Sequence, residues 1–380
     1  MSSTDNSITR ESLIRIVNLV KPALSTQDYI PALKHILFAA GFASAFNDNQ
    51  AIQVRLPSSD LNLGLCLPGD MLAKALGSFN AEKVMLAANE KDGSLSISSG
   101  RAKIKTKTLP ASAFPLELPK GKGVVIEVTD DMLEGIRRCL IGVGNNPTHP
   151  ASMGVTLDSE KQRAILYSTD NATISRYQTK TVCELPGDTP VVIPTFFCEQ
   201  LVSLAKAFPK TEVDLHVYPG ALVAEYNDPD ADTNSLMARL FTKTLDDITA
   251  LDYGKIVAKH LDISKAGGKM TTIPTTFDAA FDRALLVLGA STDKATKITP
   301  TDSGLKLLSL SDLGEAQDSI NFDGKEGADA LDVDDAFYVD PTLIARGCKS
   351  CATVGFFTRV VVFGDADGRF LHLVSHCSAS

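Results

Sequence analysis

The chain has 380 residues, which is too long for one ordinary hydrophobic core and predicts two or three domains. Apolar residues make up 44% of it and charged residues 22%, which excludes a mostly disordered chain, a collagen and a coiled coil. The net charge of −9 by itself argues against a nucleic-acid-binding protein.

Neither export nor membrane insertion is expected. No apolar run approaches the roughly 20 residues that cross a bilayer, and the polar start MSSTDNSITRESLIR has no apolar signal segment. The seven Cys residues stand at scattered spacings, which predicts reduced thiols rather than a disulfide framework. We therefore expect a cytoplasmic protein with no membrane partner.

The charge is unevenly distributed along the chain. Composition shifts near 114–123 and near 262–270, where Pro, Gly and Lys gather as in linkers. These segments divide the chain into predicted domains at 1–120, 121–265 and 266–380, each of ordinary domain length. The first domain holds 13 basic and 10 acidic side chains, the second 14 and 20, and the third 10 and 16. Only the first is therefore net basic.

Two helices are predicted in each domain. In the first helix, Leu13, Val17 and Val20 recur at helical spacing behind a capping Thr9. Four of the six helices begin with Pro in the first turn, where its missing N–H costs nothing. The predicted helices span 8–20, 67–79, 129–144, 193–208, 273–289 and 339–350.

Between the helices, apolar and polar residues alternate with a period of two, which predicts antiparallel strands joined by tight turns. The clearest examples are 94–109, 162–178 and 359–375. Each domain is therefore predicted to be α+β, with two helices packed on antiparallel sheets.

A strand–turn–strand pattern recurs once in each domain. Its three occurrences are AFNDNQAIQVRL (45–56), YSTDNATISRYQ (167–178) and SLSDLGEAQDSINF (309–322). Asp48, Asp170 and Asp312 occupy the same place in them. The period is too long for a solenoid and predicts three copies of one domain, each built from two half-copies of helix plus sheet. The alternative is coincidence, since Asp-Asn turns are common.

Several segments carry the motifs of a known family. SISSGRAKIKTKTLPASAFPLEL (96–118) runs from a strand ending S-G-R through a basic strand to T-L-P-A and F-P. The other segments are YIPALKHILFAA (29–40), AILYSTDNATISRYQ (164–178) and FLHLVSHC (370–377). Together with the triplication, they resemble bacterial DNA sliding clamps, the beta subunit of DNA polymerase III, over nearly the whole chain.

The resemblance implies a fold and a function. Clamps of this family are head-to-tail rings, usually homodimers of three-domain chains, with twelve helices lining a central hole and sheets on the outer rim. The ring encircles double-stranded DNA, tethers a replicative DNA polymerase and is placed by a clamp loader. The family performs no chemistry, so the resemblance implies a non-enzymatic processivity factor without a cofactor. The divergence of this sequence suggests a bacteriophage version.

If the helices face such a hole, their basic residues are the candidates for facing DNA, with the acidic excess on rims and loops. Phosphate contacts of this kind are sequence-independent and salt-sensitive, as sliding requires. The alternative for any one of them is a solvated helix face. The candidates are Arg10, Arg15, Lys74, Arg137, Arg138, Lys206, Lys210, Arg283, Arg346 and Lys349.

Four more basic residues alternate on one predicted strand face. They are Arg101, Lys103, Lys105 and Lys107. They form either a second basic patch or a solvated sheet face.

The resemblance also implies a groove for a short peptide motif of polymerase and loader, and a contact between subunits. By position the groove would use Thr169, Asn171, Thr173, Ile174, Leu245, Ile248, Val374, Ser375 and His376. Phe114 matches the aromatic residue of the subunit contact. The alternatives are that the groove residues pack strands and that Phe114 fills its own domain's core.

Two other functions are weighed against a clamp. Cys348-x-x-Cys351 with His372-x-x-x-His376 resembles a zinc arrangement, but the pairs stand farther apart than in small zinc fingers, so we expect no metal. No nucleophile elbow, metalloprotease or phosphate-loop motif occurs. The alternative of a different class is a clamp-like scaffold that binds proteins without encircling DNA.

Overall fold

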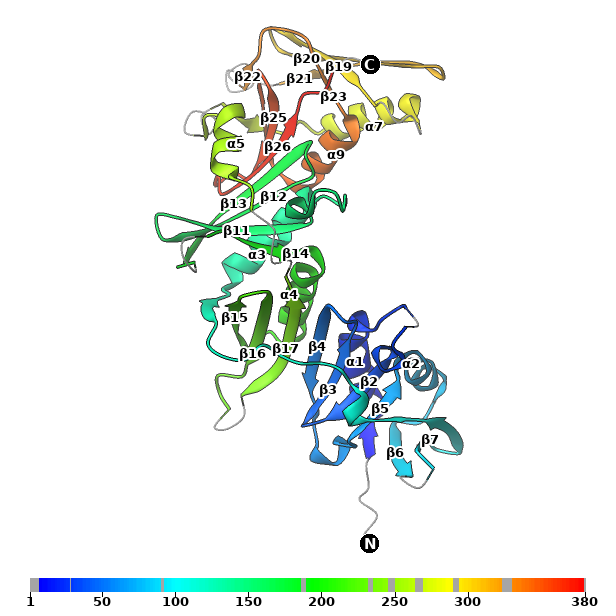
Figure 1. Cartoon of the computed structure of the whole chain (residues 1–380). Helices are drawn as coiled ribbons and strands as arrows, with labels where there is room; N and C mark the ends of the chain where they lie inside the picture. The colour runs from blue at the N-terminus through cyan, green and yellow to red at the C-terminus, as the bar shows by residue number, and fades with distance from the viewer. Residues whose placement is uncertain are drawn as a thin grey trace. The chain divides into compact units, whose positions relative to one another are not determined.

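A computed structural model describes residues 7–27, 29–89, 92–185, 189–231, 235–244, 250–263, 269–289, 294–322 and 330–378. Within them, one pattern recurs six times along the chain: a short strand, a helix, and then three antiparallel strands in a meander (Figure 1). We call each occurrence a half-repeat and the last strand of each meander its third strand. The predicted build of helix-plus-sheet halves is thus confirmed.

The half-repeats have the following bounds. The helices are α1 Arg10–Val20, α2 Gly69–Ser78, α3 Asp130–Cys139, α4 Thr195–Ala207, α7 Phe277–Leu288 and α9 Pro341–Ser350. The short strands before them are β1 Ser7–Thr9, β5 Leu65–Pro68, β10 Val124–Glu127, β14 Val191–Pro194, β18 Thr271–Thr272 and β23 Phe337–Val339.

The meanders follow the helices in the same order. They are β2 His35–Ala39, β3 Phe42–Phe46, β4 Gln50–Arg55; β6 Lys83–Asn89, β7 Ser94–Ser99, β8 Ala102–Lys107; β11 Gly154–Glu160, β12 Arg163–Thr169, β13 Thr173–Val182; β15 Glu212–Tyr218, β16 Ala221–Asn227, β17 Leu236–Lys243; β19 Thr296–Thr301, β20 Gly304–Ser311, β21 Gly314–Asn321; β24 Thr353–Phe357, β25 Val360–Gly364 and β26 Phe370–Ser375. Two further short strands are β9 Leu109–Pro110 and β22 Leu331–Asp332.

All six predicted helices are confirmed, with shorter ends. In α1 the Thr9 hydroxyl accepts the amide N–H of Ser12, so the predicted cap is present. Leu13, Val17 and Val20 are buried as their spacing requires. The helix predicted over 129–144 ends at Cys139 and continues as a 3₁₀ turn, Leu140–Gly142.

Third strands join the half-repeats into large sheets. β4 pairs antiparallel with β17, and β13 pairs antiparallel with β26. We call these two pairings the first and the second seam. Each seam lies inside a nine-stranded sheet, β10-β15-β16-β17-β4-β3-β2-β5-β9 for the first and β14-β11-β12-β13-β26-β25-β24-β18 with β22 for the second. Two four-stranded sheets, β1-β6-β7-β8 and β21-β20-β19-β23, contain the other two meanders.

The chain forms two compact units. One comprises 1–129 with 199–246, and the other 130–198 with 247–380. Each unit holds one nine-stranded and one four-stranded sheet. The seams explain this grouping, since each pairs strands from two of the predicted domains. The boundaries at 120 and 265 stay a prediction. Within the described residues, no helix is long and apolar enough to cross a membrane.

One described helix was not predicted. α5, Tyr253–His260, is capped by the preceding Asp252, whose side chain accepts the amide N–H of Lys255. Tyr253, Val257 and Leu261 are buried at i, i+4 and i+8. That spacing is a readable helical signal in a segment between the last predicted helix of the second domain and the linker near 262–270.

Substitution of two helical glycines by alanine should change the free energy of unfolding in opposite directions. A Cβ at Gly135 of α3 would lie 2.5 Å from the Tyr177 ring and 2.6 Å from Leu166, whereas nothing lies within 4 Å of one at Gly77 of α2. We expect Gly135→Ala to lower the free energy of unfolding by about 1–3 kcal/mol because the core is overpacked. We expect Gly77→Ala to raise it by about 0.5–1 kcal/mol through helix propensity. Urea denaturation of both variants measures this, and equal shifts would contradict the packing described here.

Candidate functional site

At the first seam an arginine of one helix binds the end of another. Arg15 of α1 donates from Nη2 to the carbonyl oxygen of Ala207, the last residue of α4, at 2.5 Å. Its guanidinium also lies over the ring of Phe208, 5.6 Å from the centroid. A cation at a helix C-terminus meets the negative end of the helix dipole, so this contact stabilises the seam.

The second seam has the same kind of contact, made twice. Arg138 of α3 donates to the carbonyl oxygen of Ser350, the last residue of α9, at 2.5 Å. Arg346 of α9 donates to the carbonyl oxygen of Ile141, just after α3, at 3.2 Å. Three of the ten predicted DNA-facing residues therefore join helices across seams.

Four of the ten are also neutralised by a carboxylate. Arg138 lies 2.9 Å from Glu134 and 3.1 Å from Asp365. The other pairs are Arg137–Glu134 at 2.5 Å, Arg283–Asp318 at 2.6 Å and Arg346–Asp170 at 2.8 Å. Arg137 and Arg283 hold the pKa of their carboxylate partners below the usual range by hydrogen bonding to them.

The remaining six candidates keep an unbalanced charge among the described residues. Arg10 donates to the carbonyl oxygen of Leu76, and the Arg15 contact is likewise to a carbonyl. Lys74, Lys206, Lys210 and Lys349 are exposed and make no ion pair within the described part of the chain. Lys74, Lys206 and Lys349 are the helix-borne cations most available to phosphates. Lys210, predicted to lie on a helix, stands in the turn after α4, which ends at Ala207.

The β12–β13 hairpin and β26 bring the predicted groove residues together. Thr173 pairs with Val374 across the second seam, and the Ser375 amide donates to the Ala172 carbonyl. Asp170 organises the turn: its Oδ1 accepts the amide and the hydroxyl of Thr173. Asn171 follows at φ +73°, a left-handed conformation that Asn tolerates.

Not all of these residues face solvent. Thr169, Thr173 and Val374 are buried, and the Thr169 hydroxyl donates to the Thr173 carbonyl. Asn171 is exposed, and Ile174, Ser375 and His376 are half-buried. Leu245 and Ile248 lie outside the described residues. The buried threonines shape the hairpin, so a ligand would meet the other four.

An apolar surface next to this hairpin was missed from sequence. Half-buried Ile174, Leu251, Ile263 and Met270 pack against a buried cluster under α5. Its centre is the stacked pair Tyr167 and Tyr253, with ring centroids 5.0 Å apart. α5 contributes Tyr253 and Val257 to the buried cluster beneath this surface.

The two histidines of the zinc-like pattern make a hydrogen bond and a ring contact. Fully buried His372 shares a hydrogen bond of 2.9 Å between Nδ1 and the Ser175 hydroxyl across the second seam. His376 stacks on Phe337, with centroids 4.1 Å apart. Among the described residues, no group of three or more His, Cys, Asp or Glu side chains could hold a metal ion.

Phe114 is half-buried and packs against its own unit's core. Its ring is 6.5 Å from that of Phe46, beside Phe241, in a cluster at the first seam. Its role at a subunit interface stays a prediction.

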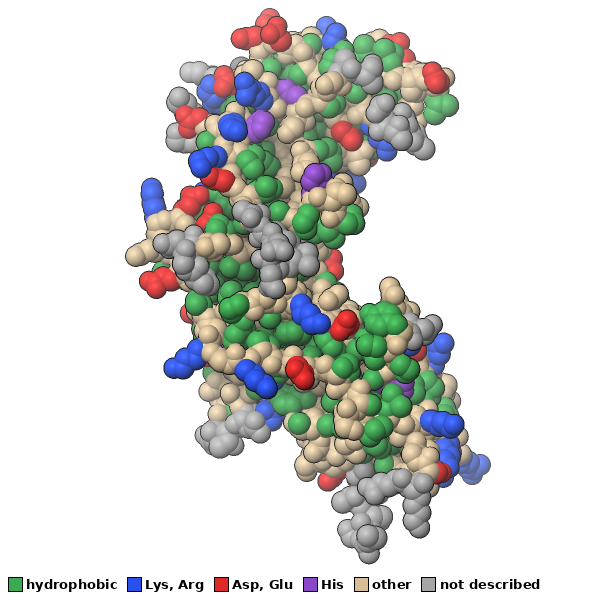
Figure 2. Space-filling model, viewed as in Figure 1, with side chains coloured by type: hydrophobic (Ala, Val, Ile, Leu, Met, Phe, Trp, Pro, Cys, Tyr) green, Lys and Arg blue, Asp and Glu red, His purple; other side chains and the backbone are tan. Residues whose placement is uncertain are grey.

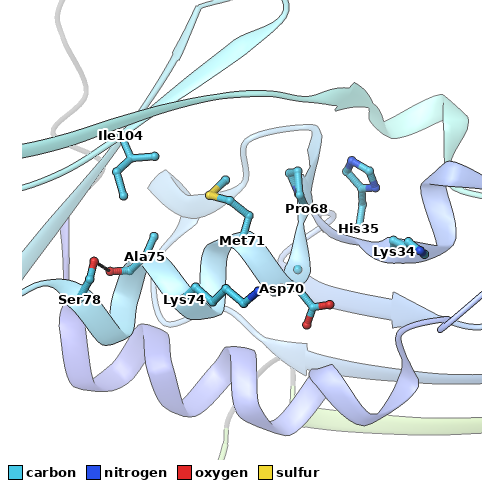
Figure 3. Close-up of a pocket in the computed structure, with 10 residues that line it drawn as sticks. Lys34, His35, Pro68, Asp70, Met71, Lys74, Ala75, Ser78 and Ile104 are labelled. Carbon is cyan, nitrogen blue, oxygen red and sulfur yellow. Dashed lines mark hydrogen bonds between the residues drawn. The ribbon is translucent and has the colours of Figure 1, made fainter.

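A hollow of about 670 Å³ lies between α2 and β8. Figure 3 shows Met71 and Ala75 of α2 and Ile104 of β8 lining it, with Lys74 at its side. β8 is the last strand of its sheet, so its outer edge has no neighbour among the described residues. The hollow thus adjoins an unpaired sheet edge.

Comparison with known proteins shows which fold this is. Neither the family models nor the curated proteins compared with the chain match it. Among solved structures, the DNA polymerase III beta subunit of Thermotoga maritima is similar at 16% identity and a TM-score of 0.80, over 99% of this chain and 100% of its own. The Caulobacter crescentus pol III beta shares 17% identity at a TM-score of 0.79. A DNA polymerase beta subunit of Streptococcus pyogenes shares 18% at 0.78.

For both of the latter structures the match covers 98% of this chain and 99% of the other. The chain therefore has the sliding-clamp fold from end to end. The resemblance seen in the sequence is confirmed at the level of the fold.

The buried histidines predict a pH dependence. Burial lowers the pKa of both His372 and His376 to about 4, from 6.5 in an unfolded chain. Between pH 6.5 and 4 the unfolded chain binds protons that the folded chain does not. The free energy of unfolding therefore decreases as the pH is lowered through this range. We expect the thermal midpoint to drop from pH 7.5 to pH 5, and to drop less in His376→Gln. Exposed His149→Gln is the control and should follow the unmodified chain. A midpoint that does not change with pH would contradict the prediction.

Proposed function

We propose that the chain is a DNA sliding clamp, in which two molecules close head to tail around duplex DNA and tether a replicative polymerase. The fold alone does not require this, because one fold hosts several functions. The observation that carries the proposal is the rule by which third strands pair, together with the two strands that the rule leaves over.

The pairing rule is periodic. β4, from the first half-repeat of its predicted domain, pairs with β17 from the second half-repeat of the next domain. β13 pairs with β26 in the same way. β21 of the third predicted domain then has no following domain, and β8 of the first has no preceding one. Both are the last strands of their sheets. A second molecule supplies the missing partner to each, which covers edges that otherwise invite disordered pairing.

Helix positions support the same closure. Arg15 is the sixth residue of α1 and Arg346 the sixth of α9, and both bind a carbonyl at a neighbouring helix end. The sixth residue of α2 is Lys74, which is exposed beside β8. If β8 pairs with β21 of a second molecule, α2 meets its α7, and Lys74 would reach the C-terminal carbonyls of that helix.

Apolar surfaces complement one another at this junction. The side chain of Leu286 in α7 is 78% exposed. Burying this apolar surface against a partner would be favourable. The Arg283–Asp318 pair joins α7 to β21. Leu286 of the same helix is therefore held close to the unpaired edge of β21. The hollow beside β8, lined by Met71, Ala75 and Ile104, would receive the leucine of the second molecule.

The proposed DNA contacts are electrostatic and sequence-independent. Lys206 of α4, Lys210 in the turn after it and Lys349 of α9 make no ion pair within the described residues, and Arg10 and Arg15 of α1 add to them. Affinity should fall steeply with salt because each neutralised phosphate releases counterions. The chain then acts without chemistry of its own, in the cytoplasm of a bacterial cell or of one infected by a bacteriophage.

We also propose that the apolar surface of Ile174, Leu251, Ile263 and Met270 binds a short motif of the polymerase and of the clamp loader. Tyr253 and Val257 of α5 belong to the buried cluster beneath these four side chains, and exposed Asn171 in the hairpin turn lies three residues before Ile174. Apolar surfaces accept extended or helical peptides through a few apolar anchors.

The first prediction concerns the ring. Light scattering should give the mass of two chains, and the protein, once loaded, should stay on circular duplexes and leave linear ones by their ends. Leu286→Glu should give single chains that are not retained, because a carboxylate would be buried in the apolar hollow.

The control for the ring is Val182→Glu, at a position 71% exposed on β13, which should remain dimeric and be retained. A wild-type monomer that no active loader retains on circles would favour the alternative function, a scaffold that binds only proteins.

The second prediction concerns the peptide surface. Ile174→Lys should weaken binding to the cognate polymerase at least about 10-fold in surface plasmon resonance, because it removes a central apolar anchor. Val182→Lys, on the same strand but outside the surface, should bind as the unmodified chain does. Equal binding by both variants would place the polymerase site elsewhere.

A further inference from the structure

One outer sheet face stands apart from the acidic rest of the chain. Val84, Leu86, Leu95 and Ile97 point into the core of the β1-β6-β7-β8 sheet, so the alternate residues point outward. On that side lie exposed Lys83 of β6 and Lys103, Lys105 and Lys107 of β8, which we call the lysine face. Figure 2 shows blue side chains gathered over the part of the surface where Figure 1 draws β6 and β7.

The charge of the lysine face is little compensated. Lys105 lies 2.5 Å from Asp92. Lys83, Lys103 and Lys107 make no ion pair within the described residues. Arg101, in the turn before β8, is exposed and adds a further cation. The three lysines of β8 stand at alternate positions of one strand, closer together than a Debye length, and repel one another. This arrangement favours an anionic partner.

Ring closure would not neutralise it. If β21 of a second molecule pairs with β8, its outward residues join the same face. Those residues are Glu315, Gln317, Ser319 and Asn321. They bring a single carboxylate, and Glu315 already accepts a hydrogen bond from the Gln317 amide. Asp318 points to the other side, where Arg283 holds it. The lysines would therefore remain available in the closed ring.

The character of the face selects the kind of anion. Ser96, Ser98 and Ala87 separate the lysine rows, and Met85, 45% exposed, is the single large apolar side chain among these outward residues. The described outward residues of β6, β7 and β8 include no aromatic ring on which a base could stack, so the lysines are the main binding groups of this face. Such a surface fits a sequence-independent polyanion with regularly spaced charges, which is the phosphate backbone of a duplex.

The spacing agrees with that partner. Alternate residues of an antiparallel strand are about 6.8 Å apart, since each residue advances about 3.4 Å. Phosphates advance about 3.4 Å per nucleotide along each DNA strand. The row of three β8 lysines, about 14 Å long, therefore spans several phosphates of a duplex without matching them one to one.

We infer that the lysine face is a second DNA site, which binds the backbone of a duplex on the outside of the molecule without encircling it. This goes beyond the proposed clamp function and does not depend on it, because no ring and no loader are needed. A clamp with such a site would hold duplex DNA next to the ring before loading or beside the encircled segment.

The test is binding of a fluorescent linear 20-base-pair duplex, followed by anisotropy without a loader at 50 and 200 mM salt. Such a short duplex cannot retain a ring. We expect Lys103→Gln/Lys105→Gln/Lys107→Gln to reduce the slope of log affinity against log salt by up to about 2.7, or roughly a 40-fold smaller loss of affinity between the two salts. At 50 mM salt the variant should bind more weakly than the unmodified chain.

The control is Lys161→Gln/Arg163→Gln/Lys180→Gln, which removes the same charge from exposed positions of the other unit and should bind as the unmodified chain does. Equal weakening by both triple variants, or none by the lysine-face variant, would overturn the inference. The Leu286→Glu variant should still bind the short duplex, and failure of the ring would leave this result intact. Unchanged thermal midpoints of the triple variants confirm that they fold.

Discussion

The unpaired edge of a β-strand is the constraint on which this structure depends. Each half-repeat ends in a third strand whose outer N–H and C=O groups need partners. Four of these strands satisfy one another in two antiparallel seams, β4 with β17 and β13 with β26. Because the seams join strands of different predicted domains, they account for the two compact units. The two strands left over carry the argument for a second molecule.

The seams also determine what the helix arginines do. Sheet pairing brings two helix ends together, and their exposed carbonyl groups attract a cation. The guanidinium groups of Arg15, Arg138 and Arg346 donate hydrogen bonds to these carbonyl oxygens. The sequence alone shows the same arginines as basic residues on predicted helices, and for that reason they were predicted to face DNA. The structure shows that a charge near a seam is used locally, which leaves lysines such as Lys206 and Lys349 as the freer cations.

Much of the fold was readable because its signals are local. The 3.6-residue spacing of Leu13, Val17 and Val20 and the period-two strands are set by neighbours in sequence. The seams are not local: Arg239 of β17 lies opposite Gln53 of β4, 186 residues away, and no short-range pattern encodes that. α5 was missed although Tyr253, Val257 and Leu261 carry a local helical signal, and the two helices predicted for that domain lie elsewhere, at 129–144 and 193–208. Leu245, which the resemblance assigns to the groove by position, lies outside the described residues.

A net charge of −9 is compatible with a DNA-binding role. A phosphate interacts mainly with the protein charges that lie within about a Debye length of it, some 8–10 Å at ordinary salt. What matters is whether cations within that distance are paired. Glu134, Asp170 and Asp318 neutralise arginines on or near helices, whereas Lys103 and Lys107 of β8 have no such partner in the described chain. An acidic total therefore coexists with local basic surfaces. The sign of each surface follows from which carboxylates the fold places beside its cations, and a sequence-wide sum does not contain that information.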